Sequence, residues 1–85
     1  MGDFVRMNLI IEKYAKRFME RQPMNQRARL LRAIHCLPSG DIKPLKGHDG
    51  VFRLRVGDFR IVFHIDETKN EIFIREIGNR GDIYK

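Results

Sequence analysis

The segment Val51-Phe-Arg-Leu-Arg-Val-Gly-Asp-Phe-Arg-Ile-Val-Phe-His-Ile65 carries the clearest structural signal in this chain of 85 residues. Apolar and basic residues alternate strictly over 52–56. Successive side chains of a β-strand point to opposite faces, so Arg53 and Arg55 should share one face while the apolar residues share the other. A row of guanidinium groups backed by an apolar face is suited to binding phosphate groups.

Two more strands are predicted directly after this first one. Residues 59–65 again alternate, with aromatic and aliphatic side chains at every second position. The Gly57-Asp58 pair between the two runs is typical of a short hairpin turn. A turn over 66–70 leads to a third strand over 71–77, which completes a meander. The basic face should then also carry Arg60.

The first half of the chain is predicted to be mostly helical. Residues 7–11 are interpreted as a short strand. A helix is expected over Glu12–Gln22, because apolar residues recur there at helical spacing, and Pro23 should interrupt it. A second helix is expected over Gln26–Leu37, with Asn25 as its N-cap. The two helices would form an antiparallel hairpin.

The predicted fold is a single α+β domain spanning residues 1–85. Residues 41–50 contain Pro44 and two glycines and are expected to form a loop. The order of elements is therefore β-α-α-β-β-β, with the helical hairpin packed on one face of a mostly antiparallel sheet. A chain of this length leaves no room for a second domain.

The charge balance favours an anionic partner. Lys and Arg total 17 against 11 Asp and Glu, which gives a formal charge of +6. Nucleic acid, an acidic protein and an anionic membrane surface all fit such a charge. A membrane partner is disfavoured, because no apolar run approaches the roughly 18 residues of a membrane-spanning helix. No signal peptide is recognisable and Cys36 is the only cysteine, so we expect a cytoplasmic protein.

Three stretches, taken in order, resemble toxins of the RelE/ParE superfamily from bacterial toxin–antitoxin modules. They are Gly40-Asp-Ile-Lys-Pro-Leu-Lys-Gly47, the hairpin segment 52–63, and Ile77-Gly-Asn-Arg-Gly-Asp-Ile-Tyr84. The similarity extends from about Met7 to Lys85 and is greater to the RelE branch. That branch cleaves mRNA in the ribosomal A site, whereas the ParE branch inhibits DNA gyrase.

The resemblance implies both a reaction and a set of site residues. The reaction is a ribosome-dependent cleavage in which the 2′-hydroxyl of the RNA attacks the phosphate and leaves a 2′,3′-cyclic phosphate, with no metal or other cofactor. The implied catalytic residues are Arg60, Arg80 and Tyr84. The implied RNA-binding residues are Lys46, Arg53 and Arg55. The implied partners are a cognate antitoxin and the ribosome with its A-site mRNA. Arginines replace the lysines of the best-known pattern at Arg53 and Arg55, which argues against proton transfer there.

Several residues have alternative interpretations. Arg53 and Arg55 would also suit a solvated strand face. A guanidinium group, whose pKa exceeds about 12, stabilises phosphorane charge well but is a poor general base. Among the histidines, His64 is expected to be a partly exposed strand residue, His48 to lie in a glycine-rich loop with a smaller role, and His35 to be structural. The alternative functions are a ParE-like gyrase inhibitor without catalysis and a basic RNA-binding module.

Overall fold

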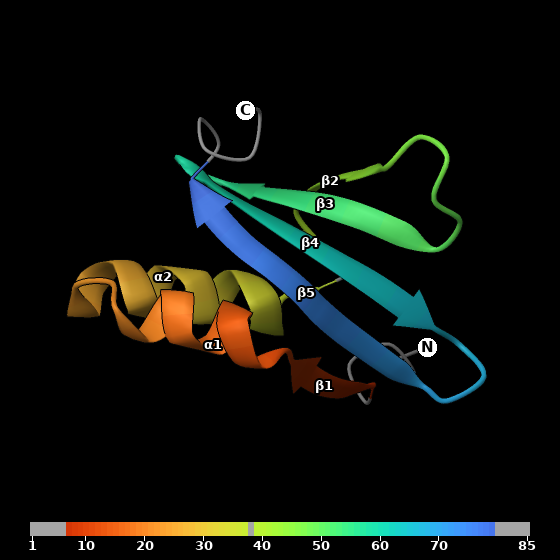
Figure 1. Cartoon of the computed structure of the whole chain (residues 1–85), viewed down its shortest axis with the longest axis horizontal. Coiled ribbons are helices and arrows are strands. Elements are labelled where there is room, and N and C mark those ends of the chain that lie inside the picture. Colours follow the sequence, from red (N-terminus) through yellow and green to blue (C-terminus); the bar gives the residue numbers. More distant parts are fainter. Residues whose placement is uncertain (1–6, 38, 80–85) are drawn as a thin grey trace.

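The computed structural model describes residues 7–37 and 39–79, which form two helices and one five-stranded sheet (Figure 1). The elements in chain order are β1 (Asn8–Ile11), α1 (Lys13–Glu20), α2 (Met24–His35), β2 (Asp41–Pro44), β3 (Val51–Val56), β4 (Phe59–Asp66) and β5 (Glu71–Asn79). The strand order is β1-β5-β4-β3-β2. Only β1 runs parallel to its neighbour, β5, and the other pairs are antiparallel. The predicted α+β class is confirmed.

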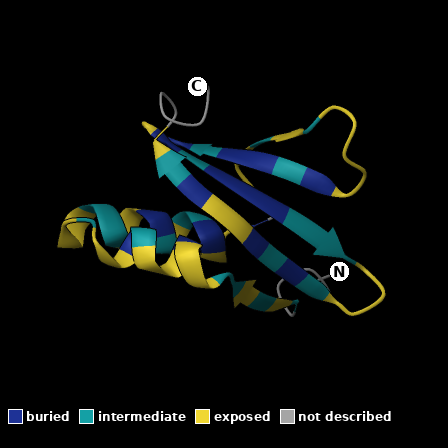
Figure 2. Cartoon of the chain, in the orientation of Figure 1, coloured by how far each residue is buried: buried dark blue, intermediate teal, exposed yellow. Residues whose placement is uncertain are grey.

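Both helices lie on the same side of the sheet, and the core fills the space between them and the strands (Figures 1 and 2). The most deeply buried side chains are Phe63, Leu30, Ile34, Leu54, Ile61 and Ile74. Four of them come from β3, β4 and β5, where they occupy the apolar positions of the predicted alternation. The basic positions of that alternation therefore face away from the helices.

The helix boundaries follow local hydrogen bonding. The carboxylate of Glu12 caps α1, accepting hydrogen bonds from the backbone N–H groups of Tyr14 at 2.8 Å and Ala15 at 3.2 Å. The prediction that Asn25 caps α2 is wrong, because that helix begins at Met24 with Pro23 in the cap position. The fixed φ of proline suits the entry to a helix, so α2 begins without a side-chain cap.

The predicted hairpin between β3 and β4 is confirmed. Val56 pairs with Phe59, so Gly57 and Asp58 alone make the turn. Gly57 has a φ of +58°, a left-handed conformation that glycine adopts without strain. A Cβ atom at Gly57 would also lie 2.7 Å from a guanidinium nitrogen of Arg29 on α2. Because that nitrogen is the far end of a flexible, exposed side chain, the positive φ of the turn is what requires glycine here.

The loop predicted over residues 41–50 is only partly a loop. Its first four residues form β2, an edge strand in which Ile42 pairs with Leu54 of β3. Ile42 packs against the core, whereas its neighbours in β2 are exposed. In β2 a single aliphatic residue, Ile42, precedes Pro44 by two positions, which gives no detectable alternation. Proline is tolerated at a sheet edge. The sheet thus contains one more strand than the predicted β-α-α-β-β-β order.

The pairing of β4 with β5 contains a β-bulge. Val62 pairs with Glu76 while the next residue, Phe63, pairs with Ile74, which leaves Arg75 as the extra residue. A bulge re-aims the side chains around it and often lies next to a functional site. Here it changes which β5 side chains reach the face opposite the helices.

None of the helices in the described ranges is long and apolar enough to cross a membrane.

Candidate nucleic-acid interface

The sheet face opposite the helices gathers the arginines of the hairpin. Arg55 of β3 lies directly across from Arg60 of β4, and Arg53 lies across from Val62, one pair further along. On the other side of Arg60 the facing residue is Gly78, which has no side chain to fill the space. Like charges placed directly opposite each other destabilise a sheet. The Arg55–Arg60 pair is therefore better suited to binding an anion than to stabilising the fold.

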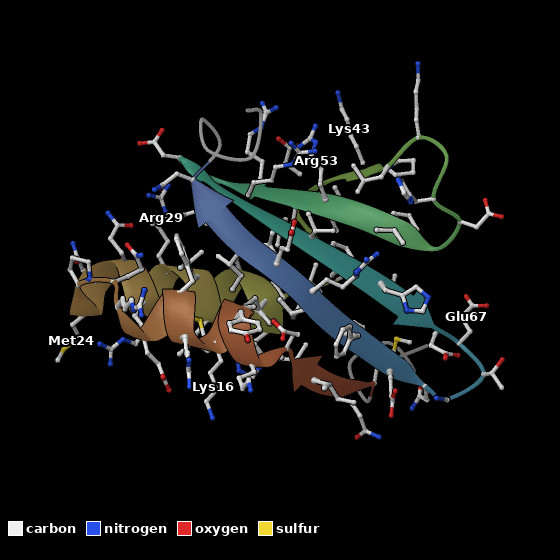
Figure 3. All side chains as sticks on the ribbon, in the orientation of Figure 1. Lys16, Met24, Arg29, Lys43, Arg53 and Glu67 are labelled. Atoms are coloured by element: carbon white, nitrogen blue, oxygen red, sulfur yellow. The ribbon has the colours of Figure 1, made fainter. Side chains whose placement is uncertain are left out.

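The edge strand β2 extends this basic face. Lys43 pairs with Arg53, and Asp41 pairs with Arg55. Figure 3 shows Lys43 and Arg53 projecting from the strands on the side away from the helix residue Lys16. We call this surface, formed by Lys43, Arg53, Arg55 and Arg60, the basic face.

Arg53 is the charged residue most removed from water within the described part of the chain, at 8% exposed. Its Nη1 atom is buried and has no hydrogen-bond partner among the described residues. A buried charged donor without an acceptor is costly to a folded protein. Arg53 is thus a buried donor rather than a solvated strand residue.

A half-open cleft of about 350 Å³ lies on the same side of the sheet. Its lining residues are Leu45, His48, Val51, Arg60, Val62, Arg75 and Glu76. Val51 and Val62 are buried and form an apolar floor, while Arg60 contributes a guanidinium group to the lining. The cleft therefore combines two guanidinium groups, an imidazole and a carboxylate around a small apolar floor.

The loop that carries His48 is held by backbone hydrogen bonds. The N–H of His48 donates to the carbonyl of Leu45, and the N–H of Val51 donates to the carbonyl of His48, each over 3.3 Å. His48 therefore lines the cleft from a tethered turn. From the sequence, His48 is expected to have a smaller role than His64, and that ranking stays a prediction.

Arg75 and Glu76 were not singled out from the sequence, although the sequence contains a signal for them. The buried isoleucines of β5 are Ile72, Ile74 and Ile77, so the spacing changes from two residues to three. A change of that kind in an alternating strand indicates a bulge. The bulge brings both residues into the lining of the cleft.

The remaining candidates lie elsewhere. His64 lines a second depression of about 490 Å³, beside Gly50 and Asp66, that does not include Arg60. Lys46 is exposed in the loop after β2, and His35 is exposed on α2. Arg80 and Tyr84 lie outside the described residues. Among the residues that are described, no cluster of three or more His, Cys, Asp or Glu side chains is arranged to hold a metal ion.

A family model for the ParE toxin of type II toxin–antitoxin systems (parDE) matches residues 9–84. The chain belongs to this toxin family. Part of the chain is also similar to a protein named RelE. A curated protein of Methanocaldococcus jannaschii named as a toxin, RelE1, is 44% identical over 45 residues, which cover 53% of this chain and 50% of that protein. The match thus spans about half the length of the curated relative.

Solved structures of toxins confirm the fold of this family member. The RelB–RelE antitoxin–toxin complex of Methanococcus jannaschii matches with a TM-score of 0.72 at 24% identity, over 88% of this chain and 94% of that chain. The RelE–RelB complex of Pyrococcus horikoshii OT3 matches with a TM-score of 0.74 at 21% identity, over 88% and 96%. The isolated RelE toxin of E. coli matches with a TM-score of 0.68 at 15% identity, over 92% and 90%.

Proposed function

We propose that this toxin is a ribosome-dependent endoribonuclease that cleaves mRNA in the A site and so inhibits translation. The observation that carries the proposal is the pairing of Arg55 with Arg60 on the face opposite the helices, beside a cleft that Arg60 itself lines. Guanidinium groups bind two phosphate oxygens at once and stay charged at any working pH. Such a site is suited to holding a phosphodiester and stabilising the extra charge of a phosphorane.

The proposed reaction is attack by the 2′-hydroxyl oxygen on the adjacent phosphorus. The new O2′–P bond forms as the P–O5′ bond breaks, which leaves a 2′,3′-cyclic phosphate and a 5′-hydroxyl. Arg60 and Arg80 would hold the scissile phosphate. Arg53, Arg55 and Lys46 would bind the flanking RNA backbone, and Tyr84 would stack on a base or assist a proton transfer.

The shape of the site supports the proposed dependence on the ribosome. The cleft is half open and its floor is a pair of valines, so it offers few contacts that would align a free RNA strand. Alignment of a nucleophile with its target is worth about 7–11 kcal/mol in well-oriented reactions. A ribosome that fixes the A-site codon would supply much of this alignment, and the toxin would supply charge.

The proposed partner of the free toxin is an antitoxin that covers the basic face. The toxins of the solved complexes from Methanococcus jannaschii and Mycobacterium tuberculosis are bound to antitoxins. A net charge of +6 on this chain, with four basic side chains on one sheet face, suits an antitoxin segment rich in Asp and Glu.

A second candidate is inhibition of DNA gyrase without catalysis, because the matching family model is named for the ParE toxin. Expression of the chain in a bacterial host separates the two. The proposed nuclease predicts new mRNA 5′ ends inside coding regions, in phase with codons, within minutes of induction. Gyrase inhibition would instead induce the DNA-damage response and leave mRNA intact. Intact mRNA in growth-arrested cells would refute the nuclease.

A further inference from the structure

The proposed cleavage needs two proton transfers that arginine performs poorly. The 2′-hydroxyl must lose a proton as it attacks, and the 5′-oxygen must gain one as it leaves. Guanidinium groups have no acceptor and keep their protons at working pH. The chemistry therefore calls for one acceptor and one donor beside Arg60, and the cleft contains one residue of each kind.

Those residues are His48 and Glu76, which line the cleft together with Arg60. His48 comes from the loop before β3, and Glu76 comes from β5 at the bulge. Both are exposed, so solvent and substrate reach them. Val51 and Val62 form the floor of the cleft and carry no competing polar group. Within the described cleft lining, these two side chains are the one imidazole and the one carboxylate.

Their positions on the sheet suit an in-line displacement. Glu76 pairs with Val62 of β4, whereas His48 lies in the loop between β2 and β3 and is tied by a backbone hydrogen bond to Val51, so the two residues reach the cleft from different elements. An in-line phosphorane places its entering and leaving oxygens on opposite sides of phosphorus, and each needs a hydrogen bond of about 2.7 Å to its proton partner. Two proton partners that line one cleft from separate elements fit that requirement.

Resting on the proposed function, we propose that Glu76 and His48 are the general base and general acid of this toxin. Glu76 accepts the proton of the 2′-hydroxyl as the O2′–P bond forms. His48, as the imidazolium, donates a proton to O5′ as the P–O5′ bond breaks. Arg60 neutralises the phosphate oxygens between them. Exchange of one proton with water at each residue restores the starting state.

The assignment of roles follows from side-chain chemistry. An ionised carboxylate has acceptor atoms only, which suits the base, and histidine is the side chain that ordinarily exchanges a proton near neutral pH, which suits the acid. The charged groups around His48 are Lys46 and Asp49 on its own loop, Arg60 on β4, and Arg75 and Glu76 on β5. Arg75, the extra residue of the bulge, lines the same cleft as Arg60.

The test uses the full-length toxin on ribosomes programmed with an mRNA that has one cleavable A-site codon. One substrate carries the natural 5′-oxygen at the scissile bond, and a second carries sulfur there, whose thiolate leaves without a proton. His48→Gln should slow single-turnover cleavage of the oxygen substrate by about 10²–10⁴-fold and restore near wild-type rates on the sulfur substrate. Glu76→Gln should slow cleavage of both substrates by a similar factor.

A pH series on the oxygen substrate gives an independent readout. Loss of the acid should remove the fall in rate at high pH, and loss of the base should remove the fall at low pH. His64→Gln is the matched control, because His64 lies on the same side of the sheet in a different depression, and its rates should equal those of the wild type.

The outcomes are distinct. Equal slowing of both substrates by His48→Gln, or wild-type rates in both variants, overturns the acid–base pair while leaving the nuclease standing. A wild-type toxin that cuts neither substrate overturns the proposed function and this inference together.

Discussion

Replacing Arg53 with methionine should make the protein more stable and less active. Arg53 is buried in the sheet between Lys43 and Val62, and its Nη1 atom lacks an acceptor among the described residues. Methionine keeps most of the aliphatic stem that fills the site and removes the charge. A cationic site that binds an anion commonly lowers the stability of the protein while no anion is bound, and Arg53 has the features of a residue in such a site.

The expected gain in the free energy of unfolding comes mainly from removing the buried Nη1 donor of Arg53, which lacks a partner among the described residues. Leaving a buried polar group unsatisfied costs about 1–3 kcal/mol. Lys43 pairs with Arg53 across β2 and β3, so removal of the Arg53 charge also relieves a repulsion between like charges. This relief adds a few tenths of a kcal/mol to the stability. We expect the free energy of unfolding of Arg53→Met to rise by about 2 kcal/mol. For a domain of this size that corresponds to an increase in Tm of about 8–16 °C.

Urea denaturation followed by circular dichroism gives the stability, with the slope m expected to stay unchanged. Cleavage on programmed ribosomes, measured in the same preparations, should fall. Arg55→Met is the control, because Arg55 is more exposed and its replacement should alter stability by less than about 0.5 kcal/mol. A less stable Arg53→Met that cleaves at the wild-type rate would mean that this arginine is a structural residue, and the reasoning about the basic face would fail.

Three further outcomes are expected. Arg60→Ala should reduce cleavage by about 10²–10³-fold, or about 3–4 kcal/mol, with little effect on stability, and wild-type toxicity at equal expression would argue against its role at the phosphate. Tyr84→Phe should retain most activity if the tyrosine stacks on a base; a loss comparable to that of Arg60→Ala would indicate proton transfer instead. Gly57→Ala should lower the free energy of unfolding by about 1 kcal/mol or more, because the turn needs a positive φ; an unchanged urea midpoint would contradict this account of the hairpin.

The hairpin segment was predictable because its physical signals agree with one another. Phe52, Leu54, Ile61 and Phe63 alternate with basic or small apolar residues, and Gly57 stands where a two-residue turn needs it. Alternation decides which face is buried, since a shift of one residue would expose the whole apolar set. The grouping of Arg53, Arg55 and Arg60 on one face followed directly and is confirmed by the register.

Other parts of the structure depend on contacts that are distant in sequence. The edge strand β2 forms because Ile42 pairs with Leu54 and packs against the core. The four residues of β2 alone do not predict this pairing. The cap of α2 was mispredicted because Asn25 is a good capping residue in isolation, whereas Pro23 set the helix start. Propensity is a weak guide when a neighbouring residue fixes the backbone.

The acid–base candidates of the site could not be paired from the sequence. His48 and Glu76 are 28 positions apart in the chain, and their meeting depends on a tethered loop and on the bulge at Arg75. Arg60 was identifiable because it interrupts an apolar strand. The predicted roles of Arg80 and Tyr84 stay predictions, since these residues lie outside the described part of the chain.

The most direct test of the central claim compares one mRNA in two states, free in solution and bound with a defined codon in the A site of purified ribosomes. The purified toxin is added to each, and the 5′ ends are mapped by primer extension. The account predicts cleavage within the A-site codon, a 2′,3′-cyclic phosphate on the upstream fragment, and little cutting of free mRNA. Intact ribosome-bound mRNA at toxin concentrations that stop translation would contradict it.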